Sequence, residues 1–304
     1  DFGQNFSGWV RLRLDTESDQ RIRLRYGELL YDDGTLNPMT SVCGQIKKPS
    51  KRGEGAPDVA WQEDIYITKG NGVEYYQPRF TFRGFRYVEL SGCSDAPDID
   101  AITGLRLNTD VREVGSFTCS NTLFNQIQQN TCWTFLSNLF SVQSDCPHRE
   151  RFGYGGDIVV SCNAFMMNYD MAGFYANTVR LFEDAAKPDG RFPDTAPFIG
   201  LSYCGVGWEM AYPLLTHKLY RYYGNRRIVD EQFPVAKKWL SALQKEYPDG
   251  IIDKGLSDHE GLEEKPEAVM ITQFYCQSIR LLEKLAEING HSEDSHYYHN
   301  LHET

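Results

Sequence analysis

The spacing of the apolar residues changes once along the chain, close to residue 112. Before this point, short segments such as residues 9–14 and 21–26 alternate apolar and charged residues with a period of two. That pattern is typical of strands with one face in solvent. After Ser116, apolar residues recur at helical spacing over longer segments. We therefore expect two domains, residues 1–112 and residues 113–304.

The first domain is predicted to be an antiparallel β-sandwich. Further segments continue the strand pattern and are separated by glycine-containing turns, at residues 64–68, 75–82, 85–90 and 102–107. A polar segment rich in proline and glycine, residues 37–58, interrupts this pattern.

The second domain is predicted to be helical. Helices are expected near residues 119–140, 158–186, 205–223, 227–247, 266–289 and from 293 onward, and Ser120 or Asn121 is suited to cap the first. Lys187-Pro-Asp-Gly190 recurs as Tyr247-Pro-Asp-Gly250, each time after a long helix, which indicates a repeated helical hairpin. The predicted fold is thus multidomain β + α, a β-sandwich followed by an (α/α)6-barrel-type toroid. Only about six helices fit, so we expect the N-terminal portion of a truncated toroid.

Charge and composition exclude several kinds of partner. The 304-residue chain has a formal charge of −11 at pH 7, which argues against nucleic acid. No run of 18 apolar residues is present, so we expect no membrane span. The N-terminus lacks a basic and apolar leader, so a signal peptide is absent or already removed. An extracytoplasmic or periplasmic location is slightly favoured over a cytoplasmic one, and the oligomeric state stays open.

Metal and redox sites are weakly indicated. The eight cysteines form no C-x-x-C pair, and free buried thiols are favoured over disulfides. Asp95, Asp98 and Asp100 match no EF-hand spacing, so a solvated turn is favoured over a calcium site. Three histidines at intervals of three residues, 296 to 302, favour a solvated helix face over a metal site. We expect neither a metal nor a cofactor.

One segment gathers carboxylates and arginines between two predicted helices: Asp145-Cys-Pro-His-Arg-Glu-Arg-Phe-Gly-Tyr-Gly-Gly-Asp157. Pro147 and three glycines favour a loop, and Asp157 is suited to cap the helix that follows. Loops held by rigid helices often carry catalytic groups. Such a mixture of charges can keep one carboxyl protonated while another is ionised. A loop of caps and salt bridges is the alternative.

This segment resembles the signature loop of the inverting α-L-rhamnosidases, usually D-C-P-x-R-(D)-E-R-x-G-W-x-G-D. It lacks one acidic residue before Glu150 and has Tyr154 in place of tryptophan. Phe80-Thr-Phe-Arg-Gly-Phe-Arg-Tyr-Val88 is similar to the sandwich of the same family, and Gly207-Trp208 keeps the family order after the loop. The resemblance covers nearly the whole chain.

The resemblance implies a glycoside hydrolase that removes terminal α-L-rhamnose with inversion. Its substrate would be a rhamnose-containing oligosaccharide, polysaccharide or glycoside. Glu150 would be the general acid that protonates the glycosidic oxygen. Asp145 and Asp157 would hydrogen-bond sugar hydroxyls and stabilise positive charge near the anomeric carbon. Arg149 would hold a hydroxyl or tune a carboxylate.

The same resemblance implies an apolar wall for the sugar. Tyr154 and Trp208 would line the apolar face and the C6 methyl group. Asp258-His259 stands where the family usually has Asp-Trp, so His259 would replace one ring of the wall. A solvated loop histidine is the alternative.

The catalytic base of the family is a glutamate in later helical hairpins, and no residue of this chain matches its motif. Glu260, Glu263 and Glu264 are nearby acids outside that motif. We therefore expect a fragment of a larger hydrolase, with negligible turnover on its own. The alternative function is that of a non-catalytic carbohydrate-binding protein with a degenerate helical domain. The clustered acids favour the enzyme, and another toroid hydrolase or a polysaccharide lyase would need a different acid loop or a Tyr/His pair.

Overall fold

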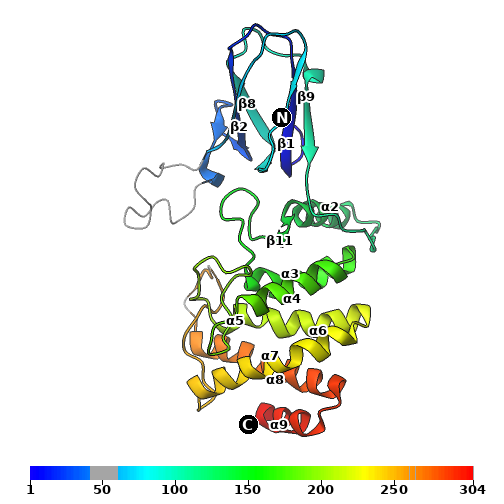
Figure 1. The fold of residues 1–304 in the computed structure, drawn as a ribbon, viewed down its shortest axis with the longest axis vertical. Coiled ribbons are helices and arrows are strands. Elements are labelled where there is room, and N and C mark those ends of the chain that lie inside the picture. The colour runs from blue at the N-terminus through cyan, green and yellow to red at the C-terminus, as the bar shows by residue number, and fades with distance from the viewer. Residues whose placement is uncertain (42–60, 260, 264, 304) are drawn as a thin grey trace. The chain divides into compact units, whose positions relative to one another are not determined.

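The computed structural model describes residues 1–41, 61–259, 261–263 and 265–303. The chain divides into two compact units (Figure 1). The first unit is Asp1–Asp110 with Phe117–Arg151, and the second is Val111–Ser116 with Phe152–Thr304. The segment of carboxylates and arginines thus contributes its first half to one unit and its second half to the other.

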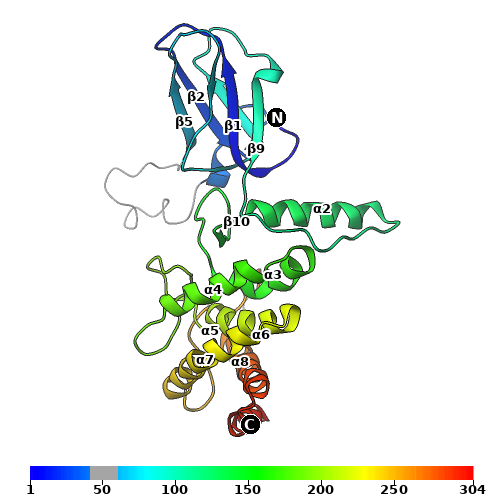
Figure 2. The same ribbon diagram turned by 45° about the vertical axis from the view of Figure 1, so that its right-hand side comes forward.

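The first unit contains the antiparallel sandwich that the alternating sequence predicts. In one sheet, β1 (Phe6–Leu14) pairs with β6 (Glu74–Tyr76), β7 (Arg83–Phe85) and β9 (Ile102–Arg106). In the other, β2 (Arg21–Gly27) lies between β5 (Gln62–Ile67) and β8 (Tyr87–Ser91) (Figure 2). A short hairpin, β3 (Leu29–Leu30) with β4 (Leu36–Asn37), follows β2.

The period-two pattern sets which side chains fill the sandwich core. Val10, Leu12 and Leu14 of β1 are buried, and the arginines between them are exposed. Ile22 and Leu24 of β2 are fully buried in the same cluster. Alternation of this kind buries one face of each strand and leaves the other in solvent.

One predicted strand is shorter than expected. Residues 75–82 were expected to be extended throughout, but β6 ends at Tyr76. Pro78 follows two residues later and has no N–H to donate to a neighbouring strand. Phe80 then takes a left-handed backbone conformation with φ of +59°. Most of the polar segment at residues 37–58 lies outside the described residues.

The first unit also contains a long helix, α2 (Thr122–Ser137), and a short hairpin of β10 (Leu139–Phe140) and β11 (Val142–Gln143). The Asn121 side chain caps α2 by accepting a hydrogen bond from the N–H of Leu123, 2.9 Å away. The predicted cap is therefore confirmed at Asn121.

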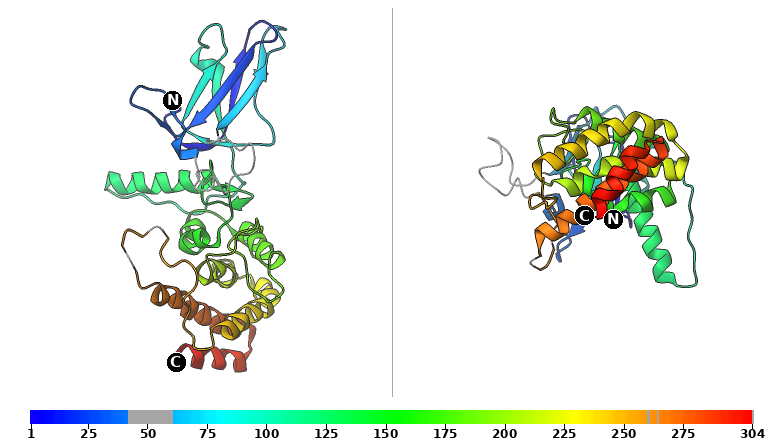
Figure 3. Two further views of the ribbon diagram at one scale, coloured as in Figure 1. Left: turned by 90° about the vertical axis from the view of Figure 1, so that its left-hand side faces the viewer. Right: turned by 90° about the horizontal axis from the view of Figure 1, so that it is seen from below.

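The second unit is helical (Figure 3). Its helices are α3 (Gly155–Asn168), α4 (Ala172–Asp184), α5 (Val206–Glu209), α6 (Ala211–Tyr223), α7 (Arg226–Glu246), α8 (Glu267–Asn289) and α9 (Ser292–Glu303). Helices next to one another in this order mostly pack together, as α6 does on α7, α7 on α8 and α8 on α9. This is the hairpin layout of the predicted toroid.

Two long predicted helices are each divided. Residues 158–186 form α3 and α4, and the break at Tyr169 is extended because Tyr169 pairs with Glu113. The N–H of Asp170 also donates to the carbonyl of Arg112, at 2.8 Å. Residues 205–223 form α5 and α6, which meet at Met210. Periodicity along one segment carries no information about a distant segment that pairs with it.

The repeated Pro-Asp-Gly motif forms the same turn after two helices, as the repeat predicts. The N–H of Gly190 donates to the carbonyl of Lys187 at 2.9 Å, and the N–H of Gly250 donates to that of Tyr247 at 3.0 Å. Both glycines have positive φ, +99° and +75°, which a side chain disfavours. The same turn thus follows both helices, three residues after the end of α4 at Asp184 and directly after the end of α7 at Glu246.

Three general features bear on function. Among the helices of the described residues, none has the length and apolar character needed to cross a membrane. Seven cysteines in the described part of the chain are free thiols, and Cys146, Cys162 and Cys204 are buried. Within the same described residues, no group of three or more His, Cys, Asp or Glu could hold a metal ion.

Candidate active site

The predicted site residues fall into two groups, one in each unit. Asp145, Arg149 and Glu150 belong to the first unit. They lie on the segment Asp145–Arg151, called the acid loop below. The other four, Tyr154, Asp157, Trp208 and His259, belong to the second unit.

Cys146 organises the acid loop. Its thiol donates to Oδ2 of Asp145 at 2.9 Å, and its sulfur accepts from the backbone N–H of Glu150 at 3.3 Å. Burial and the hydrogen bond to Asp145 raise the pKa of the Cys146 thiol, so the group stays a neutral donor at physiological pH. One buried side chain thereby links the aspartate to the glutamate backbone.

Arg149 shares this neighbourhood. Partial burial opposes the charge on its guanidinium, but contact with Cys146 and the negative charges of Glu150 and Asp145 raise its pKa overall. The acid loop therefore brings together the three predicted residues of the first unit, with one permanent cation that both carboxyl groups influence.

A polar cavity of about 500 Å³ adjoins the acid loop within the first unit. Its lining combines loop residues Asp145 to Arg149 with Glu28, the N-terminal segment and the last two turns of α2. Glu28 lies 3.3 Å from Nε2 of His148 and accepts a 2.8 Å hydrogen bond from Asn5. Burial and the nearby Arg149 lower the pKa of His148 despite the opposing charge of Glu28.

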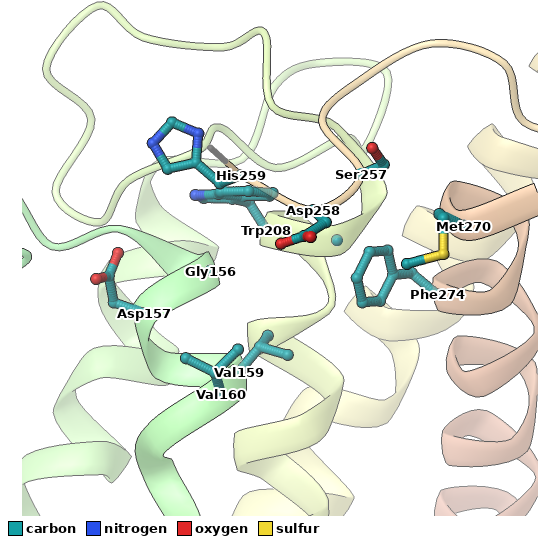
Figure 4. Close-up of a pocket in the computed structure, with 11 residues that line it drawn as sticks. Gly156, Asp157, Val159, Val160, Trp208, Ser257, Asp258, His259, Met270 and Phe274 are labelled. Atoms are coloured by element: carbon teal, nitrogen blue, oxygen red, sulfur yellow. The ribbon is translucent and has the colours of Figure 1, made fainter. Parts of the chain in front are cut away.

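The second unit contains a pocket of about 410 Å³ with a mainly apolar lining. The residues that line it come from α3, α5, α8 and the loop before α8: Gly156, Asp157, Val159, Val160, Gly207, Trp208, Ser257, Asp258, His259, Met270 and Phe274. In Figure 4, Asp157, Trp208 and His259 group on one side, with Met270 and Phe274 on the other. The pocket thus joins two carboxylates, Asp157 and Asp258, to an aromatic and aliphatic surface.

Trp208 is held by close packing. A Cβ atom on Gly156 would lie 2.4 Å from Cε2 of the indole, and a Cβ atom on Gly155 would lie 2.1 Å from the Trp208 carbonyl oxygen. The ring of His259 meets the indole edge-on, with centroids 6.3 Å apart. Only glycine at both positions allows α3 to approach the backbone and the indole of Trp208 this closely.

The start of α3 differs from what was predicted for the glycines and for Asp157. The glycines at 155 and 156 were expected to keep the segment a loop, yet α3 begins at Gly155. Asp157 was expected to cap the helix, but it lies in the first turn, and the N-cap residue is Tyr154. A carboxylate in the first turn still interacts favourably with the helix dipole.

Tyr154 is placed differently from the other predicted wall residues. Its side chain is buried, and it is not one of the residues that line the pocket. Its backbone pairs with Thr195, and the N–H of Gly155 donates to the carbonyl of Asp194 at 2.9 Å. Tyr154 thus contributes to fixing the start of α3, and through it the place of Asp157.

Asp194 was not singled out as a site residue, and it is one of the most buried carboxylates. It is 1% exposed, and its oxygens accept from the N–H groups of Tyr203 at 2.7 Å and Cys204 at 3.0 Å. The carbonyl of Cys204 in turn accepts from Leu256 at 2.8 Å. This chain of bonds ties the segment before α5 to the loop that carries Asp258 and His259.

Family models match both halves of the chain. The bacterial α-L-rhamnosidase 6 hairpin glycosidase domain matches residues 112–304, and the bacterial α-L-rhamnosidase concanavalin-like domain matches residues 1–108. The chain belongs to the bacterial α-L-rhamnosidase family. An α-L-rhamnosidase of Formosa agariphila is 33% identical over 85% of this chain, and one of Streptomyces avermitilis is 33% identical over 94%.

Solved rhamnosidase structures have the same fold. The α-L-rhamnosidase from Dictyoglumus thermophilum matches all of this chain with a TM-score of 0.91 and 36% identity. The Streptomyces avermitilis enzyme complexed with L-rhamnose matches 99% with a TM-score of 0.85 and 30% identity. The sandwich and helical toroid predicted from the sequence are thereby confirmed. This chain spans 27% of the length of both curated relatives, and 33% and 28% of the two solved chains, which agrees with the expectation of a truncated toroid.

Proposed function

We propose that this chain supplies the acid-bearing part of an inverting α-L-rhamnosidase, with Glu150 as the general acid. The observation that carries the proposal is the acid loop, which holds Asp145, Arg149 and Glu150 together around Cys146 in a chain of this family. Inverting glycosidases need a carboxylic acid that protonates the leaving oxygen and a second carboxylate that activates water. We assign the second role to no residue of this chain.

The pocket of the second unit suits the sugar. Trp208, Met270 and Phe274 offer apolar surface for the C6 methyl group and the apolar face of a pyranose. Asp157 and Asp258 offer carboxylate oxygens that accept hydrogen bonds from hydroxyl groups. L-rhamnose is the ligand named for the Streptomyces avermitilis enzyme, which supports a rhamnose-containing glycoside as the substrate here.

In this proposal the two domains, residues 1–112 and 113–304, have different roles. The helical domain carries the acid and the sugar pocket, and the sandwich supports it. A non-catalytic carbohydrate-binding function is less well supported, because a binding protein does not need a cluster of acidic residues such as Asp145, Glu150 and Asp157.

The test is hydrolysis by the full-length protein. Nitrophenyl α-L-rhamnoside should be cleaved, and NMR should detect the β-anomer of rhamnose first, because attack from the opposite face inverts the configuration. The matching α-L-mannoside, which adds one hydroxyl at C6, should have a kcat/KM lower by roughly 10–200-fold if the methyl group is bound in an apolar pocket. Absence of rhamnoside cleavage, or equal rates on both sugars, would contradict the proposal.

A further inference from the structure

Within the first unit, the sandwich segment Phe82–Gly84 contacts the acid loop. A guanidinium nitrogen of Arg151, the residue directly after Glu150, donates to the carbonyl of Phe82 at 2.9 Å. Its Nε donates to the carbonyl of Pro147 at 3.0 Å, which closes the loop on itself. The same guanidinium lies 4.2 Å from the centroid of the Phe82 ring. The Arg151 side chain therefore hydrogen-bonds both to the sandwich and to Pro147 within the acid loop.

The sandwich residues that contact the acid loop, Phe82 and Gly84, are themselves held by neighbouring side chains. The Phe82 ring stacks on Phe140 with centroids 4.2 Å apart. Gly84 approaches the loop so closely that a Cβ atom there would lie 3.1 Å from Cγ of Pro147. Gln62 holds Gly84 through two 2.8 Å hydrogen bonds, one to its carbonyl and one from its N–H. The loop thus rests on a surface with little freedom to move.

The backbone at Arg151 is strained. Its φ is +61°, in the left-handed region that residues other than glycine rarely adopt. Such strain persists where the surroundings hold the residue in place, and it is concentrated at functional sites. Burial and the neighbouring charge of Arg83 lower the pKa of Arg151, so its charge is held in place at an electrostatic cost. The conformation is maintained by the contacts to Phe82 and Pro147.

We propose that Arg151 is a positioning residue, which clamps the acid loop to Phe82 of the sandwich and so sets the direction of the Glu150 carboxyl group. The inference rests on the proposed function. It also gives a role to Phe82 and Gly84 of the Phe80–Val88 motif, which is to support the acid rather than to bind sugar. A general acid must point at the leaving oxygen, and small misplacements of catalytic groups reduce rates strongly.

The experiment uses the full-length protein and two substrates, an alkyl α-L-rhamnoside and nitrophenyl α-L-rhamnoside. Arg151→Met and Arg151→Gly should each lower kcat on the alkyl substrate by about 10²-fold with little change in KM. The nitrophenyl substrate should lose much less, because its leaving group needs little proton assistance. Arg151→Gly removes the backbone strain and should still fail, whereas Arg151→Lys keeps a cation and should recover part of the rate.

Arg86→Met is the matched control, because Arg86 lies on the same stretch of the sandwich and pairs with Asp1 at 2.8 Å, away from the loop. It should match the wild-type protein on both substrates. Equal losses on the two substrates, or no loss, would overturn the positioning role. If the Met and Gly variants do not fold, Phe82→Leu and Arg151→Lys decide it by the same dependence on the leaving group. A wild-type protein inactive on every rhamnoside would instead overturn the proposed function, and the positioning role with it.

Discussion

Glu209 is predicted to be the residue of the second unit whose charge matters most for stability. It is 3% exposed and ends α5, directly after Trp208. Its two oxygens accept from Arg191 at 2.8 Å and 2.5 Å, and one of them also accepts from the indole N–H of Trp239 at 2.6 Å. Arg191 also pairs with Glu246. Removing the charge of Glu209 leaves Arg191 buried beside a single, more exposed partner.

Glu209→Gln should reduce the free energy of unfolding by about 3 kcal/mol, the low end of the range for breaking a buried ion pair, because glutamine keeps the shape and one acceptor. Urea denaturation followed by circular dichroism measures it. Glu209→Leu combined with Arg191→Met should be less harmful than Glu209→Leu alone, since no unpaired charge remains. Glu231→Gln, which alters an exposed pair with Arg227, is the control and should leave the urea midpoint unchanged.

A loss below about 1 kcal/mol in the free energy of unfolding for Glu209→Gln would show that the Arg191–Glu209 pair does not behave as a buried ion pair. A double variant as unstable as the single leucine variant would show that the loss comes from packing rather than from the unpaired arginine.

Two further predictions concern the pocket and pH. Gly156→Ala should displace the Trp208 indole and weaken L-rhamnose binding measured by calorimetry. Gly173→Ala is the control and should bind L-rhamnose normally, because its Cβ would meet nothing within 4 Å. Equal affinities of the two variants would refute the role of the close approach between Gly156 and Trp208. The pKa of His217 is lowered to about 4, chiefly by burial and also by nearby lysine and arginine charges, so the unfolded chain binds a proton that the folded chain does not. Stability present above about pH 6.5 should therefore fall as the pH drops towards 4. His217→Gln should make the urea midpoint depend less on pH over this range. An unchanged dependence of the midpoint on pH would contradict the role of His217.

Local patterns in the sequence predicted the architecture well where one segment determines its own structure. Alternation correctly predicted the strands β1 and β2, and the helix expected near residues 266–289 is α8, which Gly290 ends in the left-handed conformation that stops helices. The failures arose where a distant segment intervenes. The break at Tyr169 depends on pairing with Glu113, and the start of α3 at Gly155 depends on room for Trp208.

The candidate site shows the same division. The motif placed Asp145, Arg149 and Glu150 in one loop, and the structure has them around Cys146. The apolar pocket lining from α8, Met270 and Phe274, had no signal in the sequence, because a helix residue that faces a pocket looks like one that faces the core. The Arg191–Glu209–Trp239 network joins three separate segments, and neither spacing nor composition indicates such contacts.

Glu150 is proposed to donate the proton to the leaving oxygen. Glu150→Gln in the full-length protein tests it, with Glu287→Gln on the exposed side of α8 as the control. An alkyl α-L-rhamnoside leaves as a poor alkoxide and should lose roughly 10²–10⁴-fold in kcat, because general acid catalysis contributes that much. Nitrophenyl α-L-rhamnoside should lose clearly less, and the alkaline limb of the pH–rate profile should vanish or move. Equal losses on both substrates with the limb unchanged would show that Glu150 only binds sugar and that another carboxyl group is the acid.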